Sequence, residues 1–142
     1  MMKSIPVWKQ ELSDGVHAAR LASLYCCSPA ETASEAARYT AVLDGLEKTF
    51  GSHAEAGLYS APGRTEIGGN HTDHQHGRVL AGSVNIDMIA AAAPNDKNQL
   101  RVQSEGYDLC VIDLNDLEAR KEEENTTAAL LRGECAAFTQ RG

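Results

Sequence analysis

The chain has 142 residues, of which 42% are hydrophobic and 23% charged, and its net charge is −7 at pH 7. This length fits one domain with a real core, so we treat residues 1–142 as one domain, and the acidic balance argues against a nucleic-acid partner, which requires a basic surface. The sequence has no apolar run near the roughly 20 residues that span a bilayer and no secretory signal at its start, which argues against a membrane partner and favours a cytoplasmic location.

The first third of the chain predicts helices. Residues 7–26 have loosely helical apolar spacing with one interruption, which predicts a broken helix or two short ones. A capping box follows, with Ser28 as N-cap, Pro29 at the first helical position and Glu31 reaching back. Gly51 predicts the end of the next helix. The apolar face of that helix consists of Ala36, Tyr39, Leu43, Leu46 and Phe50.

Beyond that helix the spacing changes from helical to alternating. A short strand is predicted at 57–61, ended by the turn residues Pro62 and Gly63, and a long or bent strand at 78–93. Residues 99–104 predict its partner strand, and residues 109–113 predict another.

The end of the chain predicts one more helix. Its start is capped within residues 125–127, and its apolar face consists of Leu131, Cys135 and Phe138. The order of elements predicts an α+β fold, in which a mostly antiparallel, mixed sheet has the N-terminal helices and this C-terminal helix packed on it.

The run from Ser60 to Leu80 contains the candidate binding and catalytic residues. Arg64 carries a permanent, fork-shaped charge suited to a phosphate or a carboxylate. Asn70, His71 and Asp73 offer amide, imidazole and carboxylate groups, and this mixture of donors and acceptors suits sugar hydroxyls. The paired glycines before them allow close approach of the backbone or a positive φ.

Three other interpretations of this run stay open. First, the run is a plain surface turn. Second, Arg64 is structural and pairs with an acid of the core. Third, the side chains of His71, Asp73, His74 and His76 together bind a metal ion. Neither standard glycine-rich nucleotide loop is present. The four cysteines form no CxxC pair, so reduced thiols are expected.

The same run resembles the N-terminal sugar-binding signature of galactokinases, members of the GHMP small-molecule kinase superfamily. The resemblance is sharp over residues 60–85 and looser elsewhere. The matching residues are Ala61-Pro62-Gly63-Arg64, Gly69, His71-Thr72-Asp73, Gly77 and Val79-Leu80.

The resemblance implies part of a GHMP kinase N-terminal domain and transfer of the ATP γ-phosphoryl group to the anomeric hydroxyl of galactose. It implies that Arg64 binds substrate and stabilises the transition state, and that His71 and Asp73 contact sugar hydroxyls. Asn70 is a further sugar contact and stands where the family usually has Glu, so the choice of sugar stays open.

The resemblance also implies parts that this sequence lacks. The family binds ATP and Mg²⁺ through a Ser-rich glycine loop and has a catalytic aspartate, and neither motif is found here. We therefore expect the sugar-binding portion of a galactokinase, inactive as this chain alone, with no metal or cofactor site of its own. The alternative is a non-catalytic, galactokinase-like protein that senses a sugar or regulates a partner.

Overall fold

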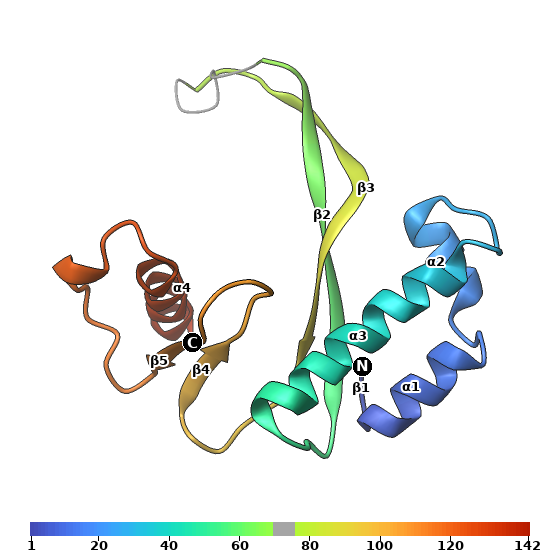
Figure 1. Ribbon diagram of the computed structural model, residues 1–142. Helices are drawn as coiled ribbons and strands as arrows, with labels where there is room; N and C mark the ends of the chain where they lie inside the picture. The colour runs from blue at the N-terminus through green and yellow to red at the C-terminus, as the bar shows by residue number, and fades with distance from the viewer. Residues whose placement is uncertain (70–75) are drawn as a thin grey trace. The chain divides into compact units, whose positions relative to one another are not determined.

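The computed structural model describes residues 1–69 and 76–142 (Figure 1). These residues form two compact units, Met1–Pro94 and Asn95–Gly142. The described residues contain four α-helices and two antiparallel sheets, so the predicted α+β class is confirmed. None of the described helices has both the length and the apolar character needed to cross a bilayer.

The first unit begins with the predicted helices. Residues 7–26 contain two short helices rather than one broken helix, α1 (Ile5–Ser13) and α2 (Ala18–Tyr25). Gly15 lies between them with a φ of +70°, a conformation that glycine adopts without steric penalty. The long helix α3 (Thr32–Phe50) follows, and Gly51 ends it at a φ of +85°, as predicted.

The capping box before α3 is present but occupies a separate turn. The Glu31 carboxylate accepts hydrogen bonds from the backbone N–H of Ser28 at 2.8 Å and from its hydroxyl at 2.7 Å. The backbone N–H of Glu31 donates to the carbonyl of Ser28, which closes one turn before the helix starts at Thr32. The predicted start at Pro29 was therefore early, since the box stabilises the turn that leads into α3.

The core of this unit lies where the three helices meet the strands. The indole N–H of Trp8 in α1 donates to the carbonyl of Ala56 at 2.8 Å, which ties that helix to the first long strand. The buried residues of this core are Ile5, Trp8, Leu12, Leu21, Tyr25, Tyr39, Leu43, Leu46 and Ala56.

The sheet of this unit has the order β1 (Met2–Lys3), β2 (Ala56–Gly68), β3 (Leu80–Ala92), all antiparallel. The prediction that Pro62 and Gly63 end the strand was wrong, because β2 continues through them. The pairing register shifts between Pro62 and Arg64, so the strand accommodates these residues in a bulge. A Cβ on Gly63 would lie 3.1 Å from the carbonyl oxygen of Ile86, which shows how closely the strands approach there.

The second unit contains β4 (Gln99–Val102), β5 (Cys110–Asp113), a 3-10 turn η2 (Lys121–Glu123) and α4 (Thr127–Arg141). Residues 99–104 were expected to pair with the preceding long strand, but β4 pairs with β5. Pro94 has no N–H to extend the ladder of β3. The C-terminal helix packs on β5 of this small sheet.

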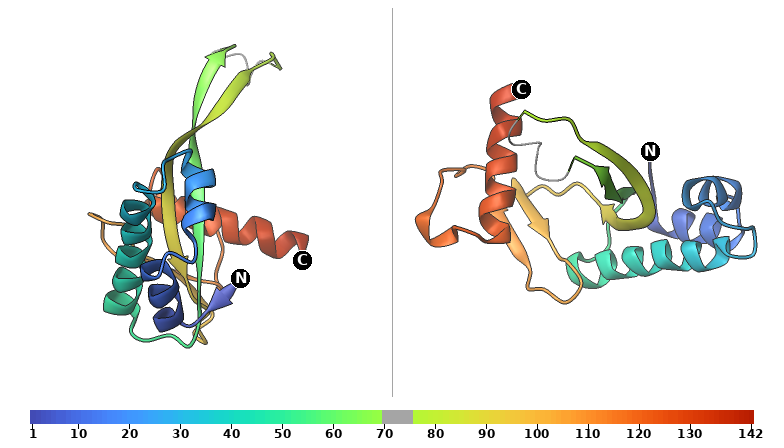
Figure 2. Two further views of the ribbon diagram at one scale, coloured as in Figure 1. Left: turned by 90° about the vertical axis from the view of Figure 1, so that its right-hand side faces the viewer. Right: turned by 90° about the horizontal axis from the view of Figure 1, so that it is seen from above.

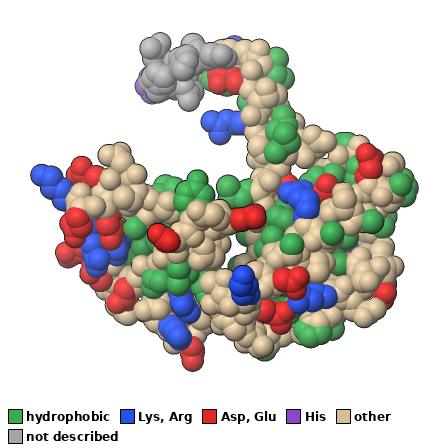
Figure 3. Space-filling model, viewed as in Figure 1, with side chains coloured by type: hydrophobic (Ala, Val, Ile, Leu, Met, Phe, Trp, Pro, Cys, Tyr) green, Lys and Arg blue, Asp and Glu red, His purple; other side chains and the backbone are tan. Residues whose placement is uncertain are grey.

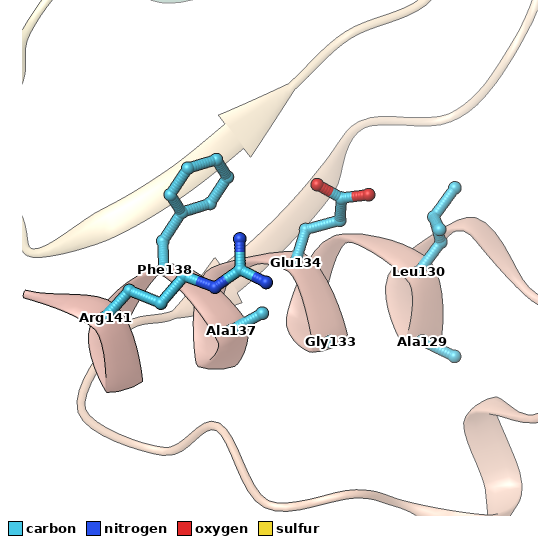
Figure 4. Close-up of a pocket in the computed structure, with 7 residues that line it drawn as sticks. All are labelled: Ala129, Leu130, Gly133, Glu134, Ala137, Phe138 and Arg141. Atoms are coloured by element: carbon cyan, nitrogen blue, oxygen red, sulfur yellow. The ribbon is translucent and has the colours of Figure 1, made fainter.

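The cap of α4 is confirmed, but part of its predicted face is wrong. The hydroxyl of Thr126 accepts from the N–H of Ala129 at 3.3 Å. Leu131 and Cys135 are half-buried as expected, whereas Phe138 is 72% exposed. Phe138 follows on the same side of the helix, closer to its C-terminal end, and lines a shallow groove with Leu130, Gly133 and Glu134 (Figure 4).

Candidate functional site

The sequence signature lies on the hairpin formed by β2 and β3. This hairpin extends well past the helices of its unit (Figures 1 and 2). Every residue of β2 from Ala61 to Ile67 is exposed. Apolar side chains of the hairpin are open to solvent as well, including Ile67, Leu80, Ile86 and Met88, and green patches are visible along it in Figure 3. Polar and apolar groups are thus presented together on a two-stranded scaffold.

Arg64 lies on this exposed part of the hairpin. It pairs with Ser83 across the strands, directly after the bulge at Pro62. Among the described residues, no acidic side chain forms an ion pair with Arg64. The structure therefore leaves its guanidinium on the surface of the hairpin, where a ligand has access to it. A buried acid does exist in this unit, but its arginine partner is Arg38.

The paired glycines at the end of β2 have different roles. Gly69 has a φ of +94°, and a Cβ there would lie 2.3 Å from the carbonyl oxygen of Arg78. Gly68 has no atom within 4 Å of its hypothetical Cβ. The predicted close approach and positive φ thus occur at Gly69, and the neighbour is the backbone that returns into β3.

The other predicted sugar contacts, Asn70, His71 and Asp73, lie outside the described residues, as does His74 of the alternative metal site. They follow Gly69 in the connection between the two strands. Within the described ranges, no three His, Cys, Asp or Glu side chains are grouped so that they could hold a metal ion. All four cysteines are free, as expected.

A second polar cluster lies at the base of the projecting hairpin, around the carboxylate of Asp87 in β3. One oxygen accepts from the hydroxyls of Ser60 at 2.5 Å and Tyr25 at 2.6 Å. The other accepts from the Arg38 guanidinium at 2.8 Å. The Tyr25 hydroxyl also lies 2.8 Å from that of Tyr39. The Asp87 side chain is only 2% exposed, whereas that of Arg38 is 41% exposed, so the cluster buries the carboxylate and leaves its arginine partner at the surface.

The electrostatics of this cluster favour a charged carboxylate. Burial by itself would raise the pKa of Asp87, but hydrogen bonds from Ser60, Tyr25 and Arg38 outweigh it and hold the pKa below its usual value. Burial, together with the hydrogen bonds to Asp87 and Tyr39, raises the pKa of Tyr25. The hydrogen bonds to Asp87 and Glu35 raise the pKa of Arg38. Asp87 therefore stays ionised and both donors stay protonated around neutral pH.

The sequence analysis missed this cluster. One signal was available, since Asp87 is a lone carboxylate between the apolar residues Ile86 and Met88 of a predicted strand. A charge in such a run needs a partner if it is buried. The partners Tyr25 and Arg38 lie 62 and 49 positions away, so no local pattern identifies them.

The part of the chain that is similar to known proteins includes the hairpin. Residues 46–94 match the family described as "Galactokinase galactose-binding signature". This stretch runs from the end of α3 through β2 and β3. The resemblance to the galactokinase signature that the residues predicted is therefore confirmed over this hairpin.

The individual proteins that the chain resembles are named galactokinases. The chain is 35% identical to the galactokinase of Ligilactobacillus salivarius (strain UCC118) over 83 residues, which are 56% of this chain and 21% of that protein. It is 34% identical over 68 residues to the galactokinase of Lacticaseibacillus casei, covering 48% of this chain and 17% of the relative. The galactokinase of Streptococcus suis (strain 05ZYH33) is 34% identical over 71 residues, 48% and 18% of the two chains.

The chain thus matches about a fifth of the length of these curated relatives. No solved structure matches it significantly.

Proposed function

We propose that this chain is the galactose-binding portion of a galactokinase and that the connection between β2 and β3, with Arg64 beside it, holds the sugar. The observation that carries the proposal is the match of residues 46–94 to the galactose-binding signature, a stretch that contains the whole hairpin. The geometry agrees, because Arg64 is exposed on the part of β2 that leads from the bulge towards the connection, which holds the other signature residues.

Each signature residue has a chemical role in this proposal. Asp73 and His71 exchange hydrogen bonds with sugar hydroxyls, which act as donors and acceptors at once. Asn70 replaces the charged Glu of the family with a neutral amide, so it binds hydroxyls without attracting a positive charge. Arg64 lies beside the reacting hydroxyl and stabilises negative charge that develops as the phosphoryl group is transferred.

The complete reaction transfers the ATP γ-phosphoryl group to the anomeric oxygen of galactose, with Mg²⁺ neutralising phosphate charge. Neither the sequence motifs nor the described residues provide a site that fits ATP or Mg²⁺. The sequence contains no second glycine-rich loop, and the described residues offer no group of metal ligands. We propose that this chain alone phosphorylates no sugar. A coupled assay for ADP with galactose and ATP tests this, and turnover above the background of a mock purification would contradict it.

Galactose binding by the chain is the direct test of the proposal. Isothermal titration calorimetry with galactose should give saturable heat in the wild type. Arg64→Ala should weaken the affinity at least tenfold, about 1.4 kcal/mol, because a charged hydrogen-bond partner of the ligand is lost. The matched control is Arg20→Ala, an exposed arginine of α2 on the same unit, which should bind like the wild type. Equal affinities for all three proteins would remove Arg64 from the site, and no binding by the wild type would refute the proposal.

A further inference from the structure

The Asp87 carboxylate joins four elements at one point. Its own strand is β3, Ser60 belongs to β2, Tyr25 ends α2, and Arg38 lies in the middle of α3. All three partners donate to it within 2.8 Å. The same cluster borders a small cavity of about 70 Å³ at the foot of the hairpin, lined by Pro62 and Asn85 among others.

The Asp87 cluster, called the junction below, lies at the point where the hairpin leaves the helices. Asp87 pairs directly with Pro62, the last residue before the register shift that precedes Arg64. Asn85 adds one longer hydrogen bond, 3.4 Å, to the carbonyl of Tyr25. Beyond that point, no described residue of β2 or β3 closer to the connecting loop makes a side-chain hydrogen bond to the helices. The junction is therefore the last strong tie between the hairpin and the helices.

The charged groups around Asp87 are suited to holding the hairpin in one orientation relative to the helices. Arg38 also pairs with Glu35 and stacks over the ring of Tyr25, with its Cζ 5.7 Å from the ring centroid. The arginine is thereby restrained from several sides. Because the carboxylate of this ion pair is buried, breaking the pair would leave a buried charge without its partner, which is costly. Three hydrogen-bond donors from three different elements converge on one carboxylate, and this favours one arrangement of hairpin and helices.

We propose that Asp87 is a positioning residue for the sugar-binding hairpin, because its carboxylate holds the bulged base of the hairpin against α2 and α3 and so fixes the direction in which Arg64 is presented. The expected effect on galactose affinity rests on the proposed function. The anchoring itself is a property of the fold.

The test is Asp87→Asn, which keeps the size of the side chain but replaces an accepting oxygen with a donating NH₂ group that faces other donors. Hydrogen–deuterium exchange of the amides in residues 63–68 and 80–86 should accelerate at least tenfold, while α1 and α3 keep their wild-type protection. Galactose affinity should fall at least tenfold in the same variant. Asp96→Asn makes the same chemical change in an exposed turn and should alter neither quantity.

Two further variants separate positioning from general stability. Ile5→Val removes one methylene from the core, and it should raise exchange across the helices without altering galactose affinity. Ser60→Ala removes only the donor on β2, and should accelerate exchange in the hairpin alone, by a smaller factor than Asp87→Asn. Because Ser60→Ala keeps the ion pair between Asp87 and Arg38, this variant tests the anchoring of the hairpin even if Asp87→Asn does not fold.

The outcomes are distinct. Wild-type exchange in the hairpin of both Asp87→Asn and Ser60→Ala would overturn the inference, as would galactose affinity unchanged in a loosened hairpin. If the wild type binds no galactose, the proposed function fails, and the exchange data alone decide whether Asp87 anchors the hairpin.

Discussion

At the scale of single residues, the chain places its two important charges in opposite environments. Asp87 is 2% exposed and surrounded by donors, whereas Arg64 stands on an exposed strand. The first arrangement specifies structure, since a buried charge tolerates only a geometry that satisfies it. The second leaves a cation available to a ligand. Under the proposed function, Arg64 would bind the sugar and Asp87 would hold the hairpin in place.

The buried carboxylate predicts a pH dependence of stability. The pKa of Asp87 is lower in the folded chain than its ordinary value of about 3.9. Its stabilisation is therefore fully present above that value and is lost as the pH falls through the folded pKa. The difference in unfolding free energy between the wild type and Asp87→Asn should be constant near neutral pH and shrink below about pH 4. Urea unfolding of both proteins at several pH values measures it, and a constant difference down to pH 3 would contradict the assignment.

Gly69 makes a second prediction at this scale. Gly69→Ala places a methyl group 2.3 Å from the Arg78 carbonyl oxygen and a side chain at a φ of +94°. The unfavourable φ alone costs about 1–2 kcal/mol, so this variant should lose at least that much unfolding free energy in urea. Gly68→Ala is the matched control, because its Cβ meets nothing within 4 Å, and its effect should stay within about 0.5 kcal/mol. Equal effects of the two substitutions would argue against the close approach at Gly69.

At the scale of elements, local signals identified the helices better than the strands. Helical structure in residues 7–26, the stop at Gly51 and a cap within residues 125–127 followed from periodicity and capping residues, and the structure then showed two helices and the cap at Thr126. The end predicted for β2 was wrong, because a bulge lets a strand continue through turn-forming residues. Strand partners depend on contacts far along the chain, and so the pairing of β4 with β5 was missed.

The cap of α4 permits a quantitative test. Thr126→Ala removes the hydroxyl that accepts from the Ala129 N–H, and loss of such a cap typically costs about 1 kcal/mol. Native-state hydrogen exchange of the first amides of α4 should accelerate accordingly, about fivefold for 1 kcal/mol. Thr127→Ala, one residue into the helix, provides no cap and should leave those rates near the wild type. Equal acceleration in both variants would show that the cap contributes nothing.

At the scale of the whole molecule, the signature and the main core occupy the same unit. All nine residues of the buried apolar cluster lie within Met1–Pro94, as does the galactose-binding match at 46–94. In the second unit the described residues classed as buried are Ile112 and Arg132. Arg132 is held by Glu123 through two hydrogen bonds of 2.8 and 2.6 Å, so this small unit relies on an ion pair beside its short core.

This division predicts that residues 1–94 fold on their own. A chain ending at Pro94 retains the complete core around Trp8, so its fluorescence should report one cooperative urea transition, with far-UV circular dichroism typical of helices. Under the proposed function, this fragment should also bind galactose within a few-fold of the full chain. A fragment that lacks a cooperative transition would show that the second unit is required for the first.

The sequence by itself determined the α+β class, the presence of the helices, the end of α3 at Gly51 and the resemblance to galactokinases, while Arg64 as a site residue remains a prediction. These inferences need only the order and spacing of residues close together in the chain. The tertiary structure decided that β2 runs through its bulge, that β4 pairs with β5, and that Asp87 gathers Tyr25, Arg38 and Ser60. The reason is physical, because the Asp87 cluster joins residues 27 to 62 positions apart, and only folding brings them within hydrogen-bonding distance.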